Sequence, residues 1–215
     1  MENNNKDKMN LDFLAEDDSE RLFGDLDYLL KDGAHIQNYG ENSFFYDYLA
    51  QNYNELNTYY LRLFGVPLRK KGEGGHQFYY LDYHSREENH IPENRRYTIK
   101  NEYIIMGAII YKIIFFDGYI ELNSVEKLKK AITLDYEEYE EGLLKLIVKS
   151  DEAGKLADDD KLIDKMVGRT LLEFKKLGWI DYKGDYFETL PSFHRLLYIY
   201  EDVIKNIKNI LSKYQ

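Results

Sequence analysis

The hydrophobic positions in the first half of the chain predict helices followed by a hairpin. Between residues 20 and 31, leucine and phenylalanine recur every three or four residues, as in an amphipathic helix, and Gly33 follows as a stop. A short extended segment, AHIQN, separates this helix from a second one over residues 43–64. Residues 66–83 place two apolar segments around a glycine-rich polar centre, which predicts two strands joined by a turn.

The second half of the chain repeats this order. Its apolar positions predict helices over residues 98–116, 124–132, 135–149 and 159–177, with Ser124 as an N-cap. Trp179 then begins a second hairpin, whose turn is Lys183-Gly184-Asp185. An amphipathic helix over residues 192–214 closes the chain.

Two copies of the order helices-then-hairpin predict a mainly α protein with small β wings, an α+β fold of tandem winged-helix domains. We expect a disordered tail over residues 1–15, an N-terminal winged-helix domain with its linker over 16–97, and a C-terminal winged-helix domain with its closing helix over 98–215. The helices over 43–64 and 98–116 carry more apolar and aromatic surface than two small domains need. We therefore also expect a two-fold homodimer.

Composition excludes several classes of function. The 215 residues include no cysteine, so disulfides and thiolate chemistry are excluded. No nucleophile is paired with a base, and His76, His84 and His90 lie in polar sequence without a rigid frame for a metal ion. We therefore expect neither an enzyme nor a cofactor nor a bound metal. The polar start of the chain, and the lysine that interrupts its longest apolar run (Tyr103–Phe116), predict a cytoplasmic protein without a membrane segment.

A net charge of −10 argues against a large DNA footprint but permits a local one. On a wheel of about 100° per residue, four basic side chains of the helix over 159–177 lie within about 80°, away from its apolar face. In a winged helix this helix faces the DNA groove. Either these residues contact DNA, together with Lys183 of the neighbouring wing, or they form an ordinary solvated face. The four are Lys161, Lys165, Arg169 and Lys176.

The first wing carries a second basic group, Arg69, Lys70 and Lys71, beside the glycines. Cationic tips of this kind suit phosphate contact, which positions a protein on DNA without reading sequence. A loop tip that only improves solubility is an equally good interpretation.

The chain contains 21 tyrosines, which suggests amphipathic surfaces, because tyrosine packs its ring and exposes its hydroxyl. Tyrosine is also enriched at interface hot spots. Our candidates for anchors of a protein partner are Tyr48, Tyr59, Tyr60 and Tyr111.

Several motifs, in the same order, resemble a known family. They are LFGDLDYLLKDGAHIQ, FYYLDYHS with IPENR after it, IIMGAIIYKI and FKKLGWIDYKGDYFETLPS. Together they are similar to MukE, the accessory subunit of the bacterial MukBEF condensin, over roughly residues 20–195. Gly33, His35 and Ile36 match the family's Gly-Arg-His-Ile motif, whereas Ala34 takes the place of its arginine and cannot perform that arginine's role.

The resemblance implies a kite protein, that is, a homodimer of tandem winged helices without enzymatic activity. It would bind a MukF-like kleisin, reach a MukB-like SMC ATPase through the kleisin, and touch double-stranded DNA weakly and without sequence preference. Its role would be chromosome condensation and partition, or SMC-based defence against plasmids. The basic stripe over 161–176 is the matching place for DNA contact.

The alternative is a tandem winged-helix transcription regulator. A regulator binds one sequence tightly and alone, whereas a kite subunit binds DNA weakly and its kleisin strongly. The acidic net charge and the tyrosine-rich helices favour the kite subunit.

Overall fold

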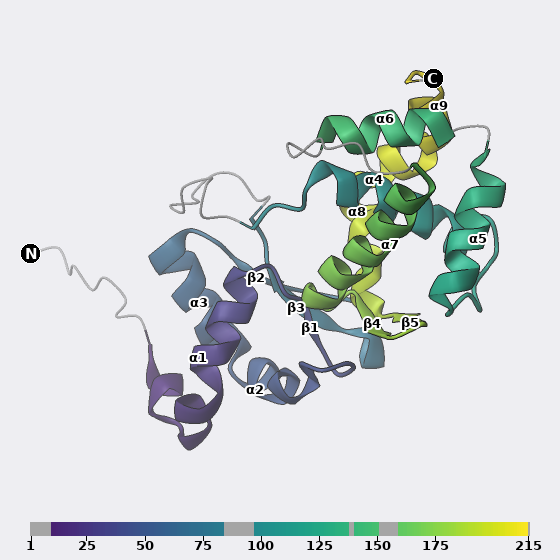
Figure 1. Ribbon diagram of the computed structural model, residues 1–215. Coiled ribbons are helices and arrows are strands. Elements are labelled where there is room, and N and C mark those ends of the chain that lie inside the picture. The colour runs from purple at the N-terminus through teal and green to yellow at the C-terminus, as the bar shows by residue number, and fades with distance from the viewer. Residues whose placement is uncertain (1–9, 84–96, 138–139, 151–158, 215) are drawn as a thin grey trace, which may run out of the picture. The chain divides into compact units, whose positions relative to one another are not determined.

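The computed structural model describes residues 10–83, 97–137, 140–150 and 159–214 (Figure 1). The chain divides into two compact units, residues 1–98 and 99–215. Both consist mainly of helices, and each contains a small antiparallel sheet. Most of the linker expected at the end of the N-terminal domain lies outside the described residues.

The described part of the N-terminal unit contains three α-helices, short 3-10 turns and a three-stranded sheet. Its strand order is β1-β3-β2, with all neighbours antiparallel, so that β3 is central and β2 lies at an edge. Gly33 follows the end of α1 as predicted, with a φ of +85°, and Gly65 ends α3 with a φ of +66°; both values favour glycine. The elements are η1 (Asp12–Ala15), α1 (Asp17–Lys31), β1 (Ile36–Gln37), η2 (Ser43–Phe45), α2 (Tyr46–Gln51), α3 (Tyr53–Phe64), β2 (Leu68–Lys71), η3 (Gly74–His76) and β3 (Phe78–Leu81).

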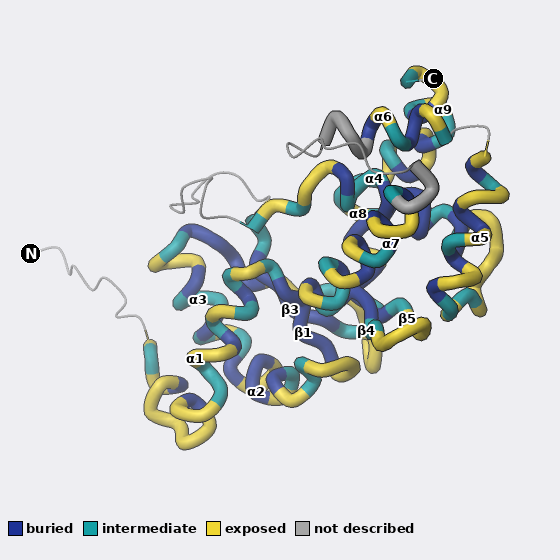
Figure 2. Tube along the Cα trace, in the orientation of Figure 1, coloured by how far each residue is buried: buried dark blue, intermediate teal, exposed yellow. Residues whose placement is uncertain are grey.

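One hydrophobic core holds this unit together. Side chains from the helices pack on one face of the sheet, and Figure 2 shows buried positions along β1 and β3. Burial of apolar area stabilises the unit by about 25 cal/mol per Å² removed from water. The core includes Leu26, Leu30, Ile36, Leu49, Leu56, Tyr60, Leu68, Tyr79 and Leu81.

The structure corrects two expectations for this unit. Residues 10–15 are not a disordered tail, because Phe13 is fully buried and its ring packs edge-on against Phe23 at 5.2 Å. The helix predicted over 43–64 is interrupted at Asn52, whose φ and ψ are −100° and 16°. The amide of Asn52 donates a hydrogen bond to Oε2 of Glu16 at 3.1 Å, a local partner of the kind that draws asparagine out of helices.

The C-terminal unit is built around α4 (Asn101–Tyr111), which packs against α7 and α8. A π-helical turn, η5 (Lys112–Phe116), continues α4. The packing is close at Gly107, where a Cβ would lie 2.5 Å from Cζ of Phe174. The other elements are α5 (Val125–Asp135), α6 (Glu140–Ser150), α7 (Asp159–Lys176), β4 (Ile180–Lys183), β5 (Tyr186–Thr189), η7 (Pro191–His194), α8 (Arg195–Lys205) and α9 (Ile207–Ser212).

The helix ends predicted for the C-terminal unit are confirmed only in part. Ser124 caps α5 as predicted, since its Oγ accepts a hydrogen bond from the backbone N–H of Lys127 at 3.3 Å. Of the helix predicted over 135–149, the structure describes α6 over Glu140–Ser150. The closing helix is two helices, with non-helical backbone at Tyr200 and a break at Asn206. In the described part of the chain, no helix has the length and apolar character needed to cross a membrane.

Candidate nucleic-acid interface

The predicted basic stripe lies on the solvent-facing side of α7. Lys165 and Arg169 are exposed, and so is Lys176, whose Nζ lies 3.5 Å from Oε2 of Glu173. Their spacing places these three on one face of the helix. Lys161 also belongs to α7, but its side chain lies outside the described residues.

An acidic neighbour of this face is neutralised by a second helix. Asp164 would weaken the positive potential beside Lys165, but its Oδ2 lies 3.2 Å from Nζ of Lys129 in α5. This ion pair is partly exposed, so it adds little to stability. Its effect is that the face of α7 keeps its positive character.

The end of α7 is joined to β4 by a tightly packed aromatic corner. Gly178 has a φ of +65°, and the backbone N–H of Trp179 donates to the carbonyl oxygen of Phe174 at 2.9 Å. The indole of Trp179 is buried, with ring centroids 5.2 Å from Phe174 and 6.3 Å from Phe193. The start of the hairpin is therefore fixed relative to the basic helix.

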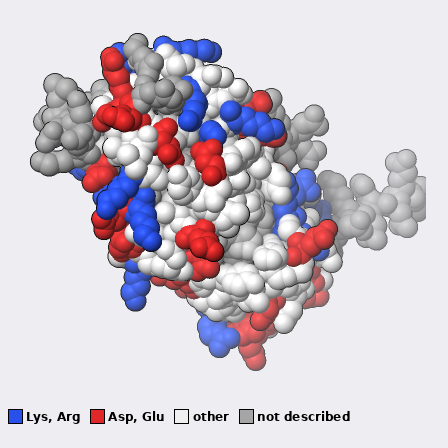
Figure 3. All heavy atoms as spheres, turned by 90° about the vertical axis from the view of Figure 1, so that its right-hand side faces the viewer, with Lys and Arg blue, Asp and Glu red and all other residues white. Residues whose placement is uncertain are grey.

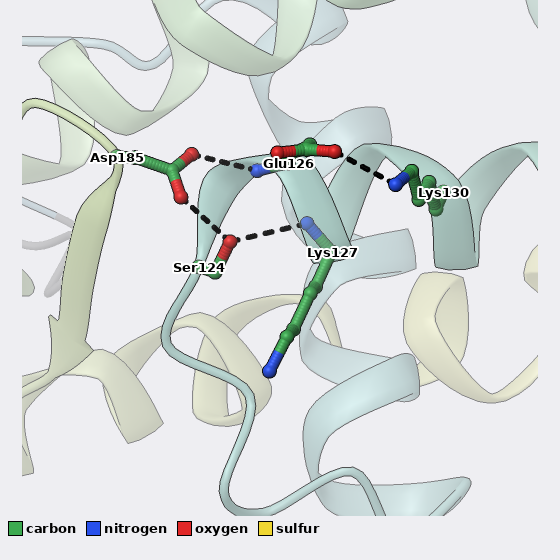
Figure 4. A network of polar contacts seen from close by, with 5 residues as sticks. All are labelled: Ser124, Glu126, Lys127, Lys130 and Asp185. Atoms are coloured by element: carbon green, nitrogen blue, oxygen red, sulfur yellow. Dashed lines mark hydrogen bonds and ion pairs between the residues drawn. The ribbon is translucent and has the colours of Figure 1, made fainter.

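The other end of the hairpin is fastened to α5 (Figure 4). One carboxylate oxygen of Asp185 accepts a hydrogen bond from Oγ of Ser124 at 2.7 Å, and the other accepts from the backbone N–H of Glu126 at 2.8 Å. The backbone N–H of Val125 donates to the carbonyl oxygen of Asp185 at 2.9 Å. The turn of the hairpin thus caps the first turn of α5 from outside the helix.

These hydrogen bonds have an electrostatic consequence. The Ser124 hydroxyl and then the Glu126 N–H stabilise the charged carboxylate, so they lower the pKa of Asp185 below its ordinary value. Asp185 is therefore held as an anion next to the exposed Lys183 in the same turn. The hairpin places Lys183 at a fixed position rather than on a free loop.

The basic residues of the first hairpin lie elsewhere than expected. Arg69, Lys70 and Lys71 are part of the edge strand β2, whereas the tip consists of Gly72 and the residues that follow it. Nζ of Lys70 lies 5.0 Å from the ring centroid of Tyr53, a cation–π distance. Charged side chains on an edge strand also prevent pairing with other strands, so this group has a structural role of its own.

Three of the four predicted tyrosine anchors are interior residues. Tyr48, Tyr60 and Tyr111 are each at most 3% exposed. The hydroxyl of Tyr60 donates to Oδ1 of Asp27 at 3.0 Å, and that of Tyr111 lies 2.7 Å from Nδ1 of His194. Burial raises the pKa of Tyr111 to about 12. The three side chains therefore lie in the core of their own unit, where their hydroxyl groups find hydrogen-bond partners, rather than on its surface.

Tyr59 is half-buried rather than exposed. Its ring meets Phe23 edge-on at 5.5 Å and Phe13 at 6.0 Å. Most of the ring therefore belongs to the aromatic packing of its own unit.

Sequence reasoning missed an exposed apolar loop in the C-terminal unit. Phe116, Tyr119 and Ile120 are 49%, 45% and 73% exposed, and they lie within five residues of one another. The signal was present, since apolar pairs flank Asp117-Gly118, a turn dipeptide that a buried helix would not contain. Clustered exposed apolar residues of this kind mark surfaces for protein partners.

The visible surface carries charge of both signs. On the face shown in Figure 3, basic and acidic side chains are interspersed and leave wide uncharged areas between them. A DNA contact on such a surface would be local.

Among the described residues there is no group of three acidic or histidine side chains that could hold a metal ion, and His84 and His90 lie outside those residues.

The family model described as "Condensin complex protein MksE" matches residues 21–201. This range takes in α7, both hairpins and most of both units. No curated protein matches the chain.

Proposed function

Because the chain belongs to the MksE family of condensin complex proteins, we propose that it is a non-enzymatic accessory subunit of an SMC–kleisin complex. In this proposal it has two winged-helix domains, pairs as a homodimer, binds the kleisin and contacts DNA weakly.

The observation that carries the proposal is a strand order that recurs in both units. In the N-terminal unit a strand after the first helix, β1, pairs with β3, and β3 pairs with β2. In the C-terminal unit Ser124, which also follows the first helix, forms a bridge with Tyr186 of β5, and β5 pairs with β4. The two units share the order of a first helix, a segment that pairs with the second strand of the hairpin, further helices and then the hairpin. This shared order supports tandem winged helices, with α6 as an added helix and a single bridge in place of the third strand in the C-terminal unit.

The helix that precedes the hairpin is α3 in the N-terminal unit and α7 in the C-terminal unit, and these two helices differ in charge. In the N-terminal unit α3 contains one acidic residue, Glu55, and one basic residue, Arg62, and Leu61 and Leu63 are exposed near its end. Residues 10–83 hold 13 acidic and 6 basic residues, a net charge of −7. Since phosphates require positive charge, we assign DNA contact to α7 and Lys183, with Arg69, Lys70 and Lys71 as a secondary phosphate contact.

For the protein partner we propose a different surface from the buried tyrosines. The exposed loop with Phe116, Tyr119 and Ile120 supplies the aromatic and aliphatic anchors that interface cores contain. A subunit of a condensin complex needs such a surface, because its place in the complex depends on binding another protein. We propose that this loop contacts the kleisin, through which the chain reaches the SMC ATPase.

The proposed role follows from these contacts. A dimer held on a kleisin raises the effective concentration of its weak DNA contacts, so that they suffice inside the complex. The role is chromosome condensation and partition in the cytoplasm, at the nucleoid, or defence against plasmids by the same kind of complex.

The DNA contact is tested by reversing charge on α7. Replacing Lys165→Glu together with Arg169→Glu should weaken binding to any duplex alike, because both side chains are exposed and would face phosphates. The matched control is Lys205→Glu with Lys213→Glu, the same charge change on exposed residues of the last helices. Affinity is measured by fluorescence anisotropy over a salt series.

The parent chain should bind with a Kd of about 10⁻⁴ to 10⁻⁶ M at physiological salt. The slope of log affinity against log salt should be about 0.9 per phosphate contact, and the α7 variant should lose about two contacts. Kleisin binding should be unchanged in both variants. Equal DNA binding by the parent and the α7 variant across the salt series would show that the stripe is only a solvated face.

A further inference from the structure

The helix that leads into the exposed apolar loop does not end as an α-helix. In the π-helical turn η5, which follows α4, the backbone N–H of Asp117 donates to the carbonyl oxygen of Lys112 at 2.9 Å, five residues earlier. Turns of this width are rare and are frequently found at functional sites. This one contains Phe116, the first of the three exposed apolar residues of the loop.

A continued α-helix would carry a charge into the core. At about 100° per residue, position 117 would lie within about 40° of Met106, Ile110 and Ile113. These three side chains are at most 1% exposed, and burying an unpaired carboxylate among them would be costly. The wider turn avoids this cost, since it leaves the side chain of Asp117 30% exposed.

Lys112 and Asp117 form an ion pair across the wide turn. Nζ of Lys112 lies 2.7 Å from Oδ1 of Asp117, and the two side chains are only 20% and 30% exposed, so water and salt screen the pair less than a fully exposed one. In an α-helix the same two positions would be about 140° apart and could not face each other. The ion pair therefore forms only with the wide turn, and it favours this turn over an α-helical one.

The aromatic residue next to Phe116 is held inward. The ring centroid of Phe115 lies 4.6 Å from that of Tyr111 and 4.9 Å from that of His194, and the hydroxyl of Tyr111 lies 2.7 Å from Nδ1 of His194. Phe115 is half-buried in this contact, whereas Phe116 is 49% exposed. The turn thus directs two adjacent phenylalanines to opposite sides, one toward its own unit and one toward solvent.

We propose that the ion pair of Lys112 and Asp117 positions Phe116 for the kleisin by selecting the π-helical turn. The inference rests on the proposed contact between the loop and the kleisin, and it adds what keeps the loop in its binding conformation. Without the ion pair, the chain populates other turns at this helix end, which do not present Phe116. The apparent affinity then falls with the fraction of chains in the binding conformation.

The test exchanges the two charges in the full chain. Lys112→Asp and Asp117→Lys, each alone, place like charges across the turn, whereas the double variant restores an ion pair with its signs reversed. Each single variant should bind a MukF-like kleisin about threefold to fivefold more weakly, the size expected for the loss of one partly exposed ion pair. The double variant should recover most of the affinity of the parent. Isothermal titration measures all four proteins.

A second measurement does not involve the kleisin. Protection from amide hydrogen exchange at position 117 reports the hydrogen bond to the carbonyl oxygen of residue 112. This protection should fall in each single variant and return in the double variant, with the Tm nearly unchanged throughout. The matched control is Lys145→Asp, which breaks an ion pair of 2.5 Å with Glu141 in α6. It makes the same change of charge and should alter neither the kleisin affinity nor the protection at position 117.

The outcomes separate this inference from the proposed function. Loss of affinity and protection in both single variants, with recovery of both in the double variant, supports the inference. If Phe116→Ser with Ile120→Ser weakens kleisin binding but both single charge variants bind as the parent does, the loop contact stands and positioning by the ion pair is wrong. If the double variant binds as weakly as the single ones, the two charges contact the kleisin directly, and the inference is wrong. If the parent binds no kleisin, the proposed function fails and the inference fails with it.

Discussion

At the scale of single residues, two helical glycines have opposite surroundings. A Cβ at Gly107 would lie 2.5 Å from Cζ of Phe174, which is fully buried, so Gly107→Ala forces the core to move. We expect a net loss of about 1–3 kcal/mol in the free energy of unfolding of the C-terminal unit. A Cβ at Gly24 meets nothing within 4 Å, so Gly24→Ala should stabilise the N-terminal unit by about 0.5–1 kcal/mol.

The two substitutions are measured by urea unfolding. Trp179 is the only tryptophan and lies in the C-terminal unit, so its fluorescence reports that unit, while circular dichroism reports both. A stabilised Gly107→Ala variant would show that α4 is not packed against α7 as described.

Trp179 itself is the second prediction at this scale. Its indole is 1% exposed and packs on Phe174 and Phe193, at the corner where α7 meets β4. Trp179→Ala should cost about 3–5 kcal/mol, the usual effect of removing a large buried aromatic side chain. Trp179→Phe, which retains an aromatic ring, should cost clearly less. Calorimetry measures the Tm of both variants. An unchanged Tm for Trp179→Ala would mean that the indole is exposed.

At the scale of elements, the contact between Asp185 and α5 decides whether the second hairpin is fixed. Asp185→Ala removes both side-chain hydrogen bonds, so the first turn of α5 should fray and the hairpin turn should loosen. Asp185→Asn keeps one acceptor oxygen, so its protection from amide hydrogen exchange should lie between that of the parent and that of Asp185→Ala. Amide hydrogen exchange at Glu126 and Lys127 measures the fraying. Equal protection in the parent and in Asp185→Ala would contradict the role of this cap.

The same contact predicts a dependence of stability on pH. The folded-state pKa of Asp185 is lowered, so its contribution is fully present above its unfolded-state pKa of about 3.9 and is lost as the pH falls through the lowered value. The difference in Tm between the parent and Asp185→Ala should therefore be constant from about pH 7 to 5 and shrink in more acidic solution. A difference that grows on acidification would have the wrong sign.

Hydrophobic spacing predicted most elements, and it failed where a polar residue or a tertiary contact decided the outcome. The turn at Lys183-Gly184-Asp185 and the cap at Ser124 follow from local chemistry, and both are confirmed. The break at Asn52 depends on Glu16, 36 residues earlier, and so could not be read from the spacing of apolar residues. The short edge strand β2 was predicted, but the position of its cations in the strand rather than at the tip was not.

At the scale of the whole molecule, the candidate site was predicted in part. The basic face of α7 follows from helix geometry alone, because one helix face is a local property. Three of the four tyrosines predicted as anchors are buried, because a tyrosine at helical spacing has the same sequence pattern whether its hydroxyl finds a partner inside the core or outside it. The loop with Phe116 and Ile120 became a candidate only through its exposure.

This loop gives a prediction for assembly. Phe116→Ser with Ile120→Ser should leave the Tm nearly unchanged, because both side chains are largely exposed, and should weaken kleisin binding at least tenfold, as the loss of central anchors does. Leu134→Ser, on a residue of α5 that is 74% exposed, is the matched control and should bind as the parent does. Isothermal titration with the kleisin distinguishes the variants. Unchanged affinity in the double variant would place the kleisin on another surface.

The central claim, that this chain is a dimeric subunit that binds a kleisin, is tested most directly by size-exclusion chromatography with multi-angle light scattering. The chain is run alone at micromolar concentration and then with a MukF-like kleisin. The account predicts a mass of twice 25.7 kDa alone and a heavier complex that contains both proteins after mixing. A mass of 25.7 kDa alone, with the two proteins eluting separately after mixing, would contradict it.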